Sequence, residues 1–237
     1  MADFTLKEWM RYKDNLRKIS DKAVDELEKY VIKNGGYANI PRQELINHVH
    51  ALSTRYGEAS AALSAEMYDA VAMVQHAAVP AAVPAATADY GKVSETVNGI
   101  IKNTASENTL VQSVGLLVKD AGQKTTIQNA RRDNAEIAFI CTGDTCAWCI
   151  MLAAKGWQRA SASDLNKDGE PAHLHANCDC TYGVRFNDSM KYSGYDPQKF
   201  ERMYYDAPLD PFEIPTAKNR LKALRRQIYK QQHNTDE

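Results

Sequence analysis

Four of the five cysteines in the chain form two tight pairs, Cys146 with Cys149 and Cys178 with Cys180, and His175 lies three residues before the second pair. Thiolates and imidazoles are ligands of tetrahedral zinc, and a two-residue gap lets one turn direct both side chains at one ion. The sequence therefore predicts a structural zinc site. These five residues are its candidate ligands, and because the ion takes four, His175 and Cys180 compete for the last position.

The redox compartment of the protein bears on the choice between a metal site, disulfides and a reduced thiol cluster. Residues 1–7 carry charges where a secretory signal needs an apolar run, and no stretch is apolar enough to span a bilayer. We therefore expect a protein made in the cytosol without a membrane anchor. In a reducing compartment, clustered cysteines favour a metal site over disulfides, and a reduced, buried thiol cluster is the other interpretation. Cys141 ends a predicted strand and is expected to be a core thiol.

A catalytic zinc site is a further alternative. Zinc hydrolases and deaminases leave one metal position open for water and need a carboxylate as general base. The chain has no His-x-Glu sequence, and the carboxylates nearest the cysteines, Asp144 and Asp179, are expected to cap turns. His173 is expected at the surface. We therefore predict that the protein is not an enzyme.

The secondary-structure elements predicted around this site indicate an α+β fold that is mostly helical. A capping box at 5–8 and apolar residues at helical spacing predict a long helix that ends at residue 34, and a second helix covers 41–76. Together they form a long N-terminal helical hairpin beside a small zinc-clipped helix and β-ribbon core. Further helices are predicted at 93–101, 110–121 and 150–155, and strands at 136–141 and 180–186.

Three regions follow from this organisation. Residues 1–88 form the helical N-terminal region, and its segment 77–87, rich in Ala and Pro, is expected to be a linker that lets the hairpin change its angle. Residues 89–190 form the core with the zinc-knuckle motif. Residues 191–237 form a tail with a basic helix.

The basic helix is a candidate contact for nucleic acid. Its six cations, uninterrupted by acidic residues, are Lys218, Arg220, Lys222, Arg225, Arg226 and Lys230. They would act through phosphates without reading sequence. A solvated helix face is the simpler interpretation, because the net charge of the whole chain is only −1.

The cysteine motifs resemble the C-terminal signature of the Mu F-like minor head proteins of tailed bacteriophages. In that family an Asp-x-x-Cys-x-x-Cys element precedes a His-x-Asn-Cys-x-Cys element, and the similar stretch here is 142–186. Ala147 and Ala176 stand where the family often has proline, which loosens the turns without removing a ligand.

The resemblance implies a minor capsid or head morphogenesis protein. Such a protein is a virion component made in few copies, acting structurally at the portal vertex or inside the head in assembly, DNA packaging or DNA delivery. Its implied partners are the portal protein, the major capsid protein and, without sequence specificity, packaged DNA. A zinc-binding, nucleic-acid-associated assembly factor is the second interpretation, and a zinc-dependent hydrolase or deaminase is the third.

Overall fold

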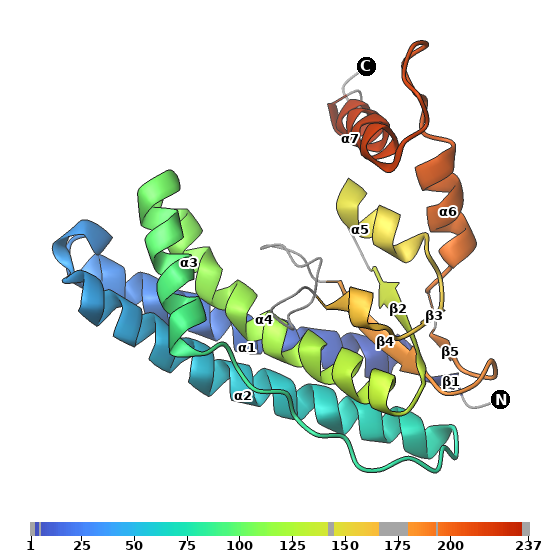
Figure 1. Cartoon of the computed structure of the whole chain (residues 1–237), viewed down its shortest axis with the longest axis horizontal. Coiled ribbons are helices and arrows are strands. Elements are labelled where there is room, and N and C mark those ends of the chain that lie inside the picture. The colour runs from blue at the N-terminus through green and yellow to red at the C-terminus, as the bar shows by residue number, and fades with distance from the viewer. Residues whose placement is uncertain (1–2, 5, 142–144, 166–179, 193, 234–237) are drawn as a thin grey trace.

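The computed structural model describes residues 3–4, 6–141, 145–165, 180–192 and 194–233. Three long helices pack side by side, and a shorter helix lies across one end of them (Figure 1). These helices are α1 (Leu6–Lys33), α2 (Arg42–Val74), α4 (Glu107–Arg132) and the shorter α3 (Tyr90–Asn103), with a 3-10 turn η1 (Tyr37–Asn39) between the first two. The prediction of a mostly helical α+β fold is confirmed.

The helix ends follow local sequence signals. α1 ends at a glycine pair in which Gly35 has φ +72° and Gly36 has φ +108°, and the Gly36 N–H donates to the Val31 carbonyl over 3.0 Å. Glycine adopts this left-handed conformation without the steric cost of a Cβ atom. α3 and α4 follow Asp89 and Ser106, whose side chains each accept a hydrogen bond from the backbone N–H three residues later.

A three-stranded antiparallel sheet lies beside the long helices. The central strand β2 (Glu136–Ile140) pairs with β3 (Gln158–Arg159) on one side and β4 (Thr181–Arg185) on the other. The strands predicted at 136–141 and 180–186 are therefore both present, and they pair with each other. The remaining described elements are β1 (Asp3–Phe4) and β5 (Lys191–Tyr192), which pair in parallel, η2 (Ala162–Asp164), α5 (Ala147–Ala153), α6 (Pro197–Tyr205) and α7 (Ala217–His233).

The free edge of β4 is completed by one side chain. The Tyr192 hydroxyl donates to the Val184 carbonyl over 2.8 Å and accepts from the Val184 N–H over 3.2 Å. The Tyr192 ring lies against Gly183, where an added Cβ would come within 3.1 Å of the ring and 2.4 Å of Ile140. Glycine at this position therefore lets the tyrosine cross the strand and satisfy its edge.

Two hydrophobic clusters hold the elements together. One joins α1, α2, α3 and α4 through apolar side chains such as Leu27, Val49, Val97 and Val114. The other joins Trp9 and residues at the end of α2 to the sheet and to α5, α6 and α7. Residues on both sides of position 88 contribute to each cluster, so the N-terminal helices share their core with the rest of the chain.

Residues 77–88 form a strap along α2 and α4. The Asn129 side chain accepts from the Val83 N–H and donates to the Val83 carbonyl, both over 2.9 Å. The Ala85 N–H donates to Thr125, and the Ala82 N–H donates to Asp69 on α2. The strap is non-helical, which the sequence predicts. Its composition also predicts a flexible linker, but the strap is hydrogen-bonded to α2 and α4 along its length.

Two elements differ from the sequence expectation. α5 begins at Ala147, three residues before the expected helix, so the first cysteine pair lies at the start of a helix and not ahead of it. α6 was not expected from the tyrosine-rich tail. It is capped by Asp196 with Pro197 in its first turn and buries Phe200 and Tyr204.

Candidate metal centre

The strand register brings the two cysteine motifs to the same end of the sheet. Ile140 at the end of β2 lies opposite Thr181 at the start of β4. In an antiparallel pair the next residues outward are Cys141, which precedes the first motif, and Cys180, which ends the second. The chain then passes from β2 through residue 145 into α5. Segments separated by some thirty residues in sequence therefore converge where the predicted site must form.

The first cysteine pair has the geometry of two corners of a metal site. The Sγ atoms of Cys146 and Cys149 lie 3.5 Å apart. Two sulfurs bound tetrahedrally to zinc at about 2.3 Å lie about 3.8 Å from each other, whereas a disulfide needs about 2.05 Å. Cys146 is exposed at the position before α5, and Cys149 is 1% exposed. The pair fits a shared ion, with one thiol open to the surface and one anchored in the core.

Cys141 lies in the core, as predicted. It is buried, and its thiol donates to the Cys149 carbonyl over 3.4 Å, which ties the end of β2 to α5. Tyr195 covers the same region and donates its hydroxyl to the Ala153 carbonyl over 3.1 Å. Burial, and secondarily the nearby Cys141, raises the pKa of Tyr195, so its hydroxyl stays a proton donor to α5.

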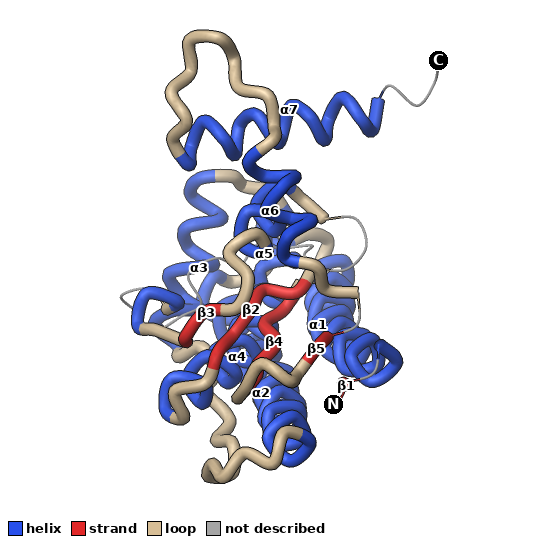
Figure 2. Tube along the Cα trace, turned by 90° about the vertical axis from the view of Figure 1, so that its right-hand side faces the viewer, coloured by secondary structure: helices blue, strands red, loops and turns tan. Residues whose placement is uncertain are grey.

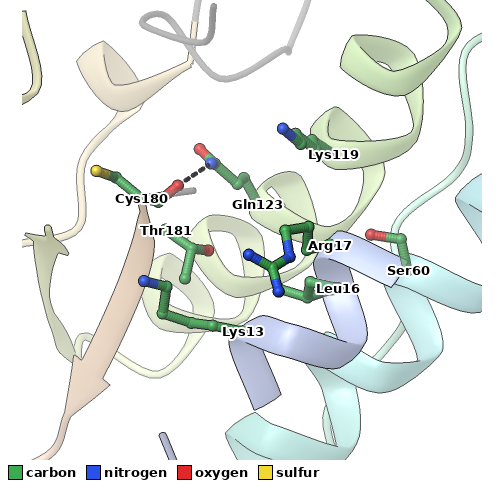
Figure 3. A pocket seen from close by; sticks show the side chains of 8 residues that line it. All are labelled: Lys13, Leu16, Arg17, Ser60, Lys119, Gln123, Cys180 and Thr181. Atoms are coloured by element: carbon green, nitrogen blue, oxygen red, sulfur yellow. Dashed lines mark hydrogen bonds between the residues drawn. The ribbon is translucent and has the colours of Figure 1, made fainter. Parts of the chain in front are cut away.

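Cys180 is held from the side of the helices. Its carbonyl accepts a hydrogen bond from the buried Gln123 side chain of α4 over 3.3 Å (Figure 3). Lys13, Arg17 and Lys119 line the same cavity of about 30 Å³, which has room for water but not for a small-molecule substrate. The Cys180 sulfur points away from these three cations (Figure 3).

A larger hollow lies around Trp157, Arg185 and Tyr195, and no thiol or imidazole of the described residues lines it. Arg185 is its main charged group, and its guanidinium lies 2.6 Å from Glu136 and 2.9 Å from Asp188. The same guanidinium stacks over the Trp157 ring at 4.9 Å. Through these contacts Arg185 holds β4 against β2, Trp157 and Asp188.

Part of the predicted site lies outside the described residues, namely His175 and Cys178, together with His173, Asp144 and Asp179. Within the ranges that the structure describes, no three His, Cys, Asp or Glu side chains gather closely enough to hold an ion. The structure thus brings Cys146 and Cys149 together, and it places Cys180 at the same end of the sheet without grouping it with them.

The six cations of the basic tail do not form one free strip. Arg226 pairs with Glu213 over 3.0 Å and with Asp210 over 3.2 Å, and Lys222 lies 3.5 Å from Glu213. Arg220 donates to the Tyr205 carbonyl over 2.9 Å and stacks over its ring. The other three, Lys218, Arg225 and Lys230, are exposed. Contact with nucleic acid stays a prediction for this helix.

Two contributors to the site have no signal in the sequence. Gln123 and Lys13 are buried polar residues on helices, and apolar periodicity alone assigns neither of them to the cysteine motifs. Only the packing of α1 and α4 against the start of β4 places them beside Cys180. Once the fold is known, the buried glutamine is explained, because its side chain is the hydrogen-bond partner of a backbone group from another element.

Comparison with known proteins gives one match. No curated protein and no solved structure matches the chain. In the described part of the chain, no helix has the length and apolar character needed to cross a membrane. The family described as VG15 protein matches residues 3–207, which includes the long helices, the sheet and both cysteine motifs. The chain therefore belongs to the VG15 protein family and is a phage-encoded protein.

Proposed function

We propose that the protein is a structural component of the head of a tailed phage, a minor capsid or head morphogenesis protein at the portal vertex or the inner head surface. Membership of a phage protein family supports the origin. The observation that carries the role is the convergence of the two motifs of the Mu F-like signature at one end of the β2–β4 ladder. A sheet that joins both motifs suits a folding role for them.

The proposed cofactor is one structural zinc ion. Cys146 and Cys149 supply two ligands, because their sulfurs already lie near the separation that a tetrahedral ion requires. Cys178 is the third. His175 is favoured as the fourth, since Cys180 is not grouped with the first pair. Zinc would then close the loop between α5 and β4 and stabilise the fold.

The proposed role includes no enzymatic turnover. A site with three thiolates and one imidazole leaves no open position for water, and the cavity beside Cys180 has only about 30 Å³. Hydrolase, deaminase and nuclease assays with zinc present should therefore stay at background. Activity that disappears in Asp144→Ala while zinc content is unchanged would favour the catalytic alternative.

The proposed partners are the portal protein, the major capsid protein or both. Packaged DNA is a weaker candidate, because three of the six cations of α7 are engaged by groups of the same chain. Such pairing reduces the charge available for phosphate contacts. The assembly-factor alternative therefore gains no support from the described contacts.

The test is quantitative mass spectrometry of virions of the phage or prophage that encodes the chain. Purified particles should contain the protein in few copies relative to the major capsid protein, and these copies should remain after washing in high salt. Particles formed without the gene should be fewer or defective in packaging. Complete absence of the chain from purified particles and from assembly intermediates would refute the proposal.

A further inference from the structure

The loop between α6 and α7 and α7 itself, residues 206–233, form an arm at one end of the molecule (Figure 2). The loop projects beyond α7, far from the long helices. Leu221, Ala223 and Leu224 bury the inner face of α7 in the core cluster, so the base of the arm is fixed. The match to the VG15 family ends at residue 207, so the arm follows the part shared with the family.

The arm exposes large apolar side chains. Phe212 is 100% exposed, Ile214 is 71% exposed and Tyr229 is 62% exposed. Single exposed apolar residues are ordinary, but a group on one projecting element marks an interaction surface. Phe212 is the extreme case, because its whole side chain faces solvent.

The turn that presents Phe212 is held in place. The Glu213 N–H donates to the Asp210 carbonyl over 2.9 Å, which closes a β-turn with Pro211 and Phe212 at its centre. Proline fixes the backbone at the first of these positions. The Asp210 and Glu213 carboxylates both bind Arg226 of α7, and that hydrogen bond lowers the pKa of Glu213. Glu213 therefore stays charged at neutral pH, and its pairing with Arg226 holds the turn in a preorganised conformation.

The surroundings of the turn are basic. The two acidic residues of the turn form ion pairs with Arg226 and Lys222, and α7 contains no acidic residue. The exposed cations Lys218 and Arg225 lie seven residues apart, two helical turns along one face of α7. An exposed aromatic residue on an arm that carries such cations is complementary to an apolar pocket with an acidic rim.

We propose that the arm is a docking element in which Phe212 inserts into an apolar pocket, rimmed by acidic side chains, on another head protein of the same particle. The inference rests on the proposed function and adds the contact through which the protein is held. Preorganisation of the turn removes much of the ordering cost of binding. Aromatic anchors of this kind commonly dominate the energetics of an interface.

The test uses the full chain and the purified portal and major capsid proteins of the encoding phage, with binding measured by biolayer interferometry. Phe212→Ser should weaken binding to one of them by about thirty-fold or more, as expected for loss of a hot-spot aromatic. The matched control is Met73→Ser, which removes a 74% exposed side chain at the end of α2 and should leave binding unchanged. Thermal stability should be the same in all three proteins.

The charge component is tested by Lys218→Glu with Arg225→Glu. This double variant should slow association, and the effect should shrink as salt is raised. Equal binding of wild type and Phe212→Ser, or binding of wild type to neither head protein, would overturn the inference. So would Phe212-dependent binding to duplex DNA, to vesicles of anionic lipid or to a second copy of this chain. Normal incorporation of Phe212→Ser into virions refutes only the docking contact, whereas absence of the wild type refutes the proposed function as well.

Discussion

The close contact between α2 and α4 predicts that alanine at Gly122 destabilises the protein, although this substitution normally stabilises a helix. Alanine in place of glycine within a helix normally stabilises it by about 1 kcal/mol. At Gly122 of α4, however, an added Cβ would lie 2.6 Å from the Ser60 Oγ, 2.8 Å from the Ser64 Oγ and 3.3 Å from the Ser60 carbonyl oxygen. The Ser64 hydroxyl also bonds the buried Tyr12 hydroxyl over 3.0 Å. The new methyl group therefore meets two buried side chains and a backbone atom.

The magnitude follows from these contacts. Overpacking a core typically costs about 1–3 kcal/mol. Turning the Ser64 hydroxyl away from Tyr12 costs about 1 kcal/mol more, and the gain in helix propensity offsets about the same amount. Gly122→Ala should therefore lower the free energy of unfolding by about 1–3 kcal/mol, which for a chain of this size lowers Tm by about 2–6 °C.

The assay is thermal and urea unfolding of Gly122→Ala beside two matched variants. Gly99→Ala, in α3, places its Cβ in open space and should raise stability by about 0.5–1 kcal/mol. Ser60→Ala removes the nearest atom, so Gly122→Ala should cost less in that background than in the wild type. A Gly122→Ala protein as stable as Gly99→Ala would refute the close approach of α2 and α4.

Two further predictions concern buried polar contacts. The hydrogen bond from Arg132, and then the one from Tyr68, lowers the pKa of Asp133. The Asp133 carboxylate therefore contributes its full stabilisation above its unfolded pKa of about 4. This stabilisation is lost as the pH falls through the lower pKa of the folded state. Asp133→Asn should therefore destabilise the protein by about 2–3 kcal/mol at pH 7, and the difference from wild type should shrink below pH 4 in thermal unfolding; a constant difference would contradict this. Tyr192→Phe should cost about 1–3 kcal/mol in urea unfolding because both backbone groups of Val184 lose their partner at the edge of β4, and an unchanged midpoint would show that water replaces the hydroxyl.

The helical framework could be read from the sequence because its signals are local. The glycine pair at 35–36 and the apolar spacing of the long helices determine their extent without reference to the rest of the chain. The strand before Cys141 and the strand after Cys180 were readable for the same reason, and their pairing follows from the need to bury both.

Other features depend on distant partners and were not readable. The strap at 77–88 is fixed by the side chains of Asn129 and Thr125, which lie on α4 and bond residues 46 and 40 positions away in sequence. α6 buries only Phe200 and Tyr204, too few apolar positions for a periodic pattern. The contact of the Cys180 carbonyl with Gln123 depends on packing as well, and the choice between His175 and Cys180 stays a prediction.

The account depends most on the proposed zinc ion, which would join the two motifs, and metal content tests it directly. Elemental analysis of protein purified under reducing conditions should give about one zinc per chain, and chelation should unfold the core, because thiolate-rich sites contribute about 10–16 kcal/mol. Cys146→Ser and Cys149→Ser should lose the metal, whereas Cys141→Ala should keep it, since Cys141 is a buried thiol beside the site. A stably folded wild-type protein without zinc, or full zinc content in Cys146→Ser, would contradict the account.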